Sequence, residues 1–135
     1  MDAQFDVMVP VRVDLSGGWT DVNPYCTDFG GEVINFTINK YVKARVDLTE
    51  GITYDFDVPI GSGLGTSGSV NVARIALLGK DQNLSLNEIA EAAYQAEIKS
   101  GNKCGRQDQW AATFGGFNRF MFHGENVEIM PFEPA

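Results

Sequence analysis

Residues 59–69 read Pro-Ile-Gly-Ser-Gly-Leu-Gly-Thr-Ser-Gly-Ser, with four glycines among the eight residues 61–68. An extended apolar segment precedes this stretch, and a helix is expected to follow it from about residue 69 to residue 78. Glycine lets the backbone approach a ligand closely and adopt positive φ. The start of the helix would direct unpaired N–H groups and the positive end of its dipole at that ligand. The combination predicts a phosphate-binding loop.

Three known glycine patterns can be compared with this loop. Residues 63–68 satisfy G-x-G-x-x-G, but a dinucleotide fold needs a strand about 20 residues on that ends in an acidic residue, and residues 83–96 are expected to be helical. The protein-kinase pattern extends to Val70, yet it requires a following strand that carries Val-Ala-Ile-Lys. The P-loop pattern needs a lysine where this chain has Thr66. A tight strand-to-helix connection without a ligand is the simple alternative, although four glycines exceed what a turn requires.

Composition limits the partners of this chain. A net charge of −8 argues against a general affinity for nucleic acid, although a small phosphorylated ligand needs only local positive potential. The 135 residues suffice for one domain with its own core. Cys26 and Cys104 are expected to be reduced. The chain starts without a basic segment and a long apolar segment, and no apolar run approaches the roughly 20 residues of a membrane span, so a cytoplasmic protein that does not bind membranes is expected.

The order of strand and helix signals predicts an α+β fold. Alternating or β-rich segments indicate strands, and apolar spacing, a capping box from Ser85 to Glu88 and a possible C-cap at Gly101 indicate helices. The order predicts a two-layer domain with a mostly antiparallel sheet covered on one face by helices. The expected strands are 5–9 ending at residue 10, with 12–16 as an extension or a neighbour, then 33–48 as one strand or two, 52–58, 117–122 and 127–130, and the expected helices are 69–78, 85–100 and 107–114.

Three segments together resemble the GHMP small-molecule kinases. The glycine loop is similar to their phosphate-binding signature. Residues 12–21, Arg-Val-Asp-Leu-Ser-Gly-Gly-Trp-Thr-Asp, resemble their amino-terminal substrate motif, and residues 105–116 resemble the segment that carries their catalytic aspartate. The sequences of these segments are most similar to those of the bacterial sugar kinases, namely the fucokinases and heptose-phosphate kinases. Galactokinases have Glu-His where this chain has Gly18-Trp19, so galactose is a less expected substrate.

The resemblance implies that Asp108 is the catalytic base, which accepts the proton of a sugar hydroxyl or orients that hydroxyl. Arg12 would lie beside Asp108, keep it ionised by opposite charge and stabilise charge on the transferred phosphoryl group. By local sequence alone, Asp108 is also typical of an acidic residue at a helix start, and Arg12 of a surface cation on a strand.

The resemblance also implies the ligands of ATP, Mg²⁺ and the sugar. Mg²⁺ would be held by Ser67 and Glu97, although a glutamate on a helix is more commonly solvated. Asp21 would bind sugar hydroxyls beside Gly18, and Trp19 would present its ring to the sugar or, alternatively, pack in the core. The triphosphate would be wrapped by the backbone of Gly61, Gly63, Leu64, Gly65, Thr66 and Ser67.

GHMP kinases have a second, carboxy-terminal domain that closes the active site. We therefore expect residues 1–135 to be a single amino-terminal, ATP-binding domain, shortened between residues 21 and 59, with the carboxy-terminal domain absent. The expected activity is ATP-dependent phosphorylation of a sugar or sugar-phosphate hydroxyl, weak in this chain alone because closure orients the substrates and excludes water. The alternatives are a non-catalytic nucleotide- or sugar-binding module, one half of a two-chain kinase, and a structural fragment. Newly exposed apolar surface would favour self-association.

Overall fold

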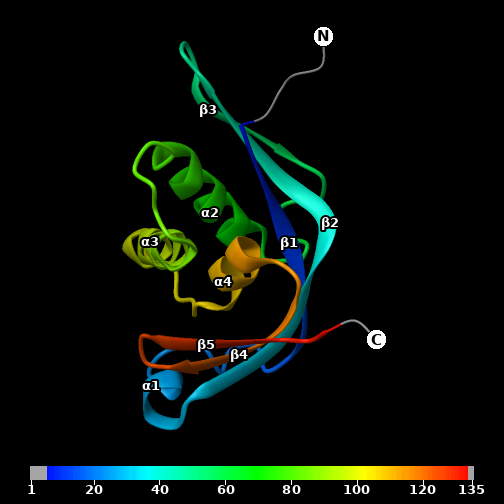
Figure 1. The fold of residues 1–135 in the computed structure, drawn as a ribbon, viewed down its shortest axis with the longest axis vertical. Helices are drawn as coiled ribbons and strands as arrows, with labels where there is room; N and C mark the ends of the chain where they lie inside the picture. The colour runs from blue at the N-terminus through cyan, green and yellow to red at the C-terminus, as the bar shows by residue number, and fades with distance from the viewer. Residues whose placement is uncertain (1–5, 134–135) are drawn as a thin grey trace.

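Five strands form one sheet within residues 6–133, the part of the chain that the computed structural model describes, and three longer helices pack on one face of it (Figure 1). A fourth, short helix lies beside the β4–β5 end of the sheet. The elements in chain order are β1 (Val7–Ser16), α1 (Tyr25–Phe29), β2 (Gly31–Asp47), β3 (Gly51–Phe56), α2 (Thr66–Leu78), α3 (Leu86–Lys99), α4 (Gln107–Phe114), β4 (Phe117–His123) and β5 (Asn126–Pro131).

The long strand β2 organises the sheet. The strand order is β1-β2-β4-β5, and β3 also pairs with β2. β1 lies along one edge of β2, whereas β4 pairs with the beginning of the other edge and β3 with its end. Every pairing among the described strands is antiparallel. The predicted two-layer α+β fold with a mostly antiparallel sheet is therefore confirmed.

A register irregularity in β1 shapes the functional side of the sheet. Val9 and Val11 are both buried in the core, and the pairing with β2 shifts between Pro10 and Arg12. Irregularities of this kind bend a strand and re-aim its side chains. After the shift, Arg12 pairs with Thr37 of β2 and Asp14 pairs with Asn35. The Asn35 side chain points toward α4, where it donates to Gln107.

Two clusters of buried apolar side chains join the helices to the sheet. The first lies between α2 and the β1–β2 half of the sheet, and it consists of Val9, Val11, Val42, Ala44, Val72, Ala73, Leu77, Ala93 and Ala112. The second lies under α3 and α4, and it consists of Cys26, Val33, Ala90, Tyr94, Trp110, Ala111, Phe120 and Phe122. Together they hold the N-termini of α2 and α4 over the same part of the sheet.

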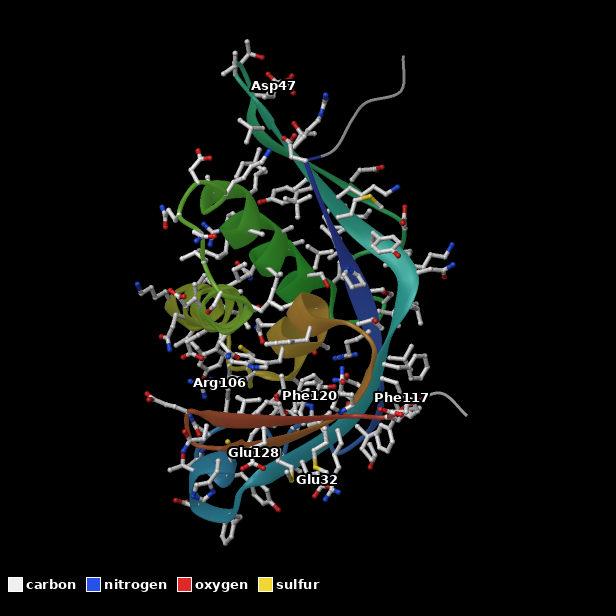
Figure 2. The ribbon with its side chains drawn as sticks, in the orientation of Figure 1. Glu32, Asp47, Arg106, Phe117, Phe120 and Glu128 are labelled. Atoms are coloured by element: carbon white, nitrogen blue, oxygen red, sulfur yellow. The ribbon has the colours of Figure 1, made fainter. Side chains whose placement is uncertain are left out.

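A buried arginine ties the second cluster together. Arg106 is 4% exposed, and its Nε and Nη2 donate to the two carboxylate oxygens of Glu91 at 2.8 and 2.9 Å. Its Nη1 donates to the Gly124 carbonyl at 2.9 Å, and its guanidinium lies 4.1 Å from the centre of the Tyr94 ring. Figure 2 shows Arg106 between α3 and the β4–β5 hairpin. Arg106 therefore anchors the start of α4 to two other elements.

Local sequence signals located most elements correctly. α4 has the predicted bounds, the segment 12–16 extends β1 through Pro10, and the segment 33–48 is one strand. The capping box is present, with Ser85 Oγ accepting from Glu88 N at 3.1 Å and Glu88 Oε1 accepting from Ser85 N at 3.2 Å. Phe5, expected in the first strand, lies outside the described residues.

Two predicted boundaries were wrong, and one helix was not predicted. α2 begins at Thr66 instead of residue 69, because left-handed Gly65 already forms its N-cap. The third predicted strand ends at Phe56 instead of residue 58. α1 was not predicted, and it is a five-residue helix whose short sequence carries little periodic signal. No helix among the described residues is long and apolar enough to cross a membrane.

Candidate functional site

The glycine loop adopts backbone conformations that only glycine takes without strain. Gly61, Gly63 and Gly65 have φ values of 84°, 83° and 72°. Gly65 is the N-cap of α2, and within the described chain no side chain caps this helix. The first helical hydrogen bond runs from Ser69 N to Gly65 O at 3.1 Å. The N–H groups of residues 66–68 therefore have no partner inside the helix, as an anion-binding helix start requires.

Arg12 connects this loop to β1 and α4. Its backbone N–H donates to Leu64 O at 2.9 Å, and its Nη1 donates to Gly63 O at 2.9 Å. Its Nε and Nη2 both bind Asp108 Oδ1, at 2.8 and 2.7 Å. One side chain thus fixes the distance between the glycine loop and the predicted base.

Two glycines allow α2 and α4 to meet at their N-termini. A Cβ at Gly68 would lie 2.6 Å from the Cβ of Asp108, closer than two carbon atoms can approach. A Cβ at Gly65 would lie 3.2 Å from Asp108 Cγ. The absence of side chains at these positions lets the carboxylate of Asp108 approach the glycine loop. Sequence analysis assigned the loop glycines to phosphate binding and missed this packing role.

Burial raises the pKa of Asp108 above its ordinary value of 3.8, while the charge and hydrogen bond of Arg12 act in the opposite direction. The neighbouring Asp21 and Glu97 raise it further. Arg12 thus favours the ionised form, as expected, but desolvation outweighs it. A carboxylate whose pKa lies nearer the working pH is a stronger proton acceptor.

Glu97 is buried, contrary to the usual behaviour of a helix glutamate. It is 4% exposed, and Ser67 Oγ donates to its Oε1 at 2.9 Å. Its Oε2 accepts from Asn71 Nδ2 at 3.1 Å and from Gln109 Nε2 at 3.0 Å. Ser67 and Glu97 are therefore brought together, and Asn71 and Gln109, which sequence analysis missed, hold the carboxylate. Gln109 directly follows Asp108 in the sequence, and this position could have indicated that it belongs to the site.

The substrate segment after β1 is folded tightly. Asp21 is 6% exposed, with Oδ1 accepting from Trp19 N and Oδ2 from Gln107 N, both at 3.1 Å. Burial raises the pKa of Asp21 despite these bonds. The Trp19 side chain is 70% exposed, and its backbone has a φ of 79°. The alternative that Trp19 packs in the core is therefore wrong.

A pocket of about 450 Å³ lies where the three motif segments meet. Its walls include Arg12, Trp19, Asp21, Ser67, Glu97 and Asp108. Of the loop residues, Ser67 lines the pocket, while a side chain at Gly61 or Gly63 would meet open space. Gly18 lies nearby, packed against Asp14. The walls carry four carboxylates against two cationic side chains, so the pocket offers mainly hydrogen-bond acceptors.

The two cysteines are free thiols. Cys26 is buried in the second core cluster, and Cys104 lines the pocket. Burial raises the pKa of Cys104 to about 11, helped by the charges of Glu97 and Asp108. A thiol with so high a pKa is a poor nucleophile at neutral pH.

Comparisons with known proteins agree with the arrangement of these segments. The family model described as "GHMP kinases N terminal domain" matches residues 32–116. The D-glycero-alpha-D-manno-heptose 7-phosphate kinase of Campylobacter jejuni is 32% identical over an alignment 175 positions long, gaps included, which covers 90% of this chain and 51% of that protein. The L-fucokinase/L-fucose-1-P guanylyltransferase of Bacteroides fragilis is 55% identical over 29 residues, 22% of this chain and 3% of that protein.

Among solved structures, a D-glycero-D-manno-heptose 1-phosphate kinase from Bacteroides thetaiotaomicron superposes with a TM-score of 0.79 at 27% identity. The match covers 95% of this chain and 60% of that one. The chain spans about half the length of the heptose 7-phosphate kinase that it resembles.

Proposed function

Because the chain belongs to the GHMP kinases, matching their amino-terminal domain, we propose that it transfers the terminal phosphoryl group of ATP to a hydroxyl group of a sugar or sugar phosphate. The observation that carries this proposal is Arg12, which binds both the glycine loop and Asp108. It places a candidate base beside a loop whose geometry suits a phosphate. A reaction that consumes ATP fits a cytoplasmic enzyme.

The glycine loop would hold the triphosphate. Phosphoryl transfer depends mainly on positioning and on stabilising charge. The uncapped start of α2 offers N–H groups for this purpose. The binding backbone would be that of Gly61, Gly63, Leu64, Gly65, Thr66 and Ser67.

Asp108 would accept the proton of the attacking hydroxyl. Arg12 occupies its Oδ1, and within residues 6–133 its Oδ2 has no hydrogen-bond partner. The hydroxyl oxygen would bond to the terminal phosphorus as the bond to ADP breaks, while the hydroxyl proton passes to Oδ2. The guanidinium of Arg12, next to the loop, would stabilise the charge that develops on the phosphoryl group.

Ser67 and Glu97 would hold Mg²⁺. Their side-chain oxygens lie 2.9 Å apart and both residues line the pocket. Oxygen ligands are those that Mg²⁺ prefers, and the ion commonly keeps several waters, so a site with two protein ligands fits this pair. No group of three or more His, Cys, Asp or Glu side chains able to hold a metal occurs within residues 6–133. Bound Mg²⁺ would neutralise charge on the phosphate oxygens.

The sugar would lie between Trp19 and the carboxylates of the pocket. The exposed ring of Trp19 offers an apolar face, with Gly18 and Asp21 beside it. We further propose that this chain acts as the ATP-binding domain, and that closure by a second domain or a partner chain raises its activity by excluding water. The reason for this part of the proposal is that the chain spans only about half the length of the heptose 7-phosphate kinase it resembles.

Two measurements on the chain and its Asp108→Asn variant test the function. Saturating ATP with Mg²⁺, at a hundred times its dissociation constant, should stabilise both proteins by about 2.7 kcal/mol. Turnover with a sugar panel should fall about 10²- to 10⁴-fold in Asp108→Asn and stay unchanged in Asp55→Asn, which alters an exposed residue of β3. Absence of a melting shift would contradict ATP binding. Equal shifts without turnover in either protein would favour the non-catalytic binding module.

A further inference from the structure

The Asp21 carboxylate, which sequence analysis assigned to sugar binding, is buried and accepts two backbone N–H groups of the fold. Both oxygens of Asp21 accept backbone N–H groups, and its side chain is buried against Gly105. Its hydrogen bond to Gln107 N holds the first turn of α4, which carries Asp108. Asp21 therefore supports the site structurally, and another acceptor is available to the sugar.

Asp14 is such an acceptor. It follows Arg12 by two residues on β1, pairs across the sheet with Asn35 and lines the same pocket. Its side chain is exposed, and within residues 6–133 it accepts no hydrogen bond. A Cβ at Gly18 would overlap its Oδ2. Glycine at position 18 therefore leaves the space that the Asp14 carboxylate occupies.

Gln107 supplies a donor beside this acceptor. It is 5% exposed and lines the pocket. Its Oε1 accepts from Asn35 Nδ2 at 3.4 Å, and Asn35 is fully buried. Its Nε2 lies 3.6 Å from the Cβ position at Gly18 that Asp14 Oδ2 also borders. No described residue accepts a hydrogen bond from Nε2, and the negative charge of Asp14 favours the amide nitrogen on this side.

We propose that Asp14 and Gln107 together bind one hydroxyl group of the acceptor sugar, a role that rests on the proposed kinase function. The hydroxyl would donate to Asp14 Oδ2 and accept from Gln107 Nε2, because a hydroxyl is at once donor and acceptor. The two atoms lie close enough to Gly18 for one oxygen to bridge them with ordinary hydrogen bonds. A phosphate or carboxylate at this position would be repelled by Asp14 and Asp21. The pair therefore selects a free hydroxyl there.

Calorimetric titration of the Mg–ADP-loaded chain with L-fucose and with D-glycero-D-manno-heptose 7-phosphate tests this assignment. Asp14→Ala and Gln107→Leu should weaken binding of the sugar that binds wild type by about 10- to 100-fold, the value of a charged hydrogen bond. Mg–ADP affinity should stay unchanged in both. Asp55→Ala, a matched change on β3, should alter neither affinity. Asp14 is exposed, so Asp14→Ala should keep the melting temperature of wild type. Gln107→Leu leaves the buried Asn35 Nδ2 without its acceptor and can lower the melting temperature, so Asp14→Ala is the decisive variant.

Monodeoxy analogues of the bound sugar separate a direct contact from a structural effect. One analogue should bind wild type as weakly as the parent sugar binds Asp14→Ala, and Asp14→Ala should bind that analogue and the parent equally. Unchanged sugar affinity in Asp14→Ala, an equal loss for every analogue, or binding of neither sugar by wild type would overturn the assignment. Failure of the proposed kinase function would appear separately, as failure of Mg–ADP to bind wild type.

Discussion

Arg12 and Asp108, 96 positions apart in the chain, meet at a single carboxylate oxygen. Both Nε and Nη2 of Arg12 bind Oδ1, at 2.8 and 2.7 Å. Within the described residues, Oδ2 is left without a donor. The arginine thus orients the carboxylate and still leaves it an oxygen that can accept a proton from a hydroxyl group.

Replacing Arg12 by methionine should raise the pKa of Asp108 further. The charge and hydrogen bond of Arg12 lower this pKa, whereas burial raises it, so removal of the cation favours the neutral acid. A ¹³C NMR titration of the Asp108 carboxyl group measures the change directly. In an active preparation, the acidic limb of the turnover profile should move to higher pH. Arg74→Met, on α2, is the control, and an unchanged or lower pKa in Arg12→Met would contradict this account.

Gly68→Ala should destabilise the protein and disturb Asp108. The added Cβ would lie 2.6 Å from the Cβ of Asp108, so α2 and α4 must separate. Overpacking of this kind costs about 1–3 kcal/mol, measurable by urea unfolding. Gly51→Ala is the control because its Cβ would meet open space. The strain at its φ of 81° should cost about 1 kcal/mol without changing the titration of Asp108. The packing explanation fails if Gly68→Ala changes neither the unfolding free energy nor the titration of Asp108.

Glu97→Gln should weaken the binding of the Mg²⁺ ion that accompanies ATP. The change removes the negative charge but keeps one oxygen, which can still accept from Asn71 and Gln109, while the new amide nitrogen can donate to the Ser67 hydroxyl. The apparent Mg²⁺ affinity should fall about 10- to 100-fold, as for other changes around metal sites. Mg²⁺ titration of the ATP-induced melting shift provides the measurement. Glu128→Gln on β5, on the side of the sheet away from α2, α3 and α4 (Figure 2), should leave this affinity unchanged. Identical Mg²⁺ curves for Glu97→Gln and wild type would exclude Glu97 as a ligand.

Arg106→Met should remove a stabilising contribution that depends on pH. The hydrogen bond from Arg106 lowers the pKa of Glu91 below its ordinary value of 4.5. A lowered pKa stabilises the fold above the unfolded-state pKa, and this stability is lost as the pH falls through the folded-state pKa. The difference in unfolding free energy between wild type and Arg106→Met should thus be largest near neutral pH, about 2 kcal/mol, and shrink below pH 4.5.

The control for this prediction is Arg119→Met. Arg119 and Glu32 form an ion pair with side chains 38% and 49% exposed. Exposed pairs contribute about 0–1 kcal/mol, so this variant should change stability little. Urea unfolding at several pH values compares the two variants. A constant difference between wild type and Arg106→Met across the pH range would show that Glu91 titration contributes nothing.

Local chemistry determined which segments would form the site. The glycines at positive φ, the capping box at Ser85 and the short helix at residues 107–114 are set by steric and hydrogen-bonding preferences within a few residues, which a sequence shows directly. The resemblance of three segments to one family then indicated that Arg12, Ser67 and Asp108 act together.

Only the tertiary structure decided where these side chains lie and which groups they contact. By sequence Glu97 is typical of a solvated helix residue, but packing of α3 against α2 and α4 buries it among Ser67, Asn71 and Gln109. Asp21 was expected to bind sugar, and its two oxygens accept the backbone N–H groups of Trp19 and Gln107, whereas Asp14 accepts no hydrogen bond within residues 6–133. The positions of these carboxylates depend on the register shift in β1 and on the close approach of α2 to α4. Both arise from packing between segments that lie far apart in the chain, and no local preference records that packing.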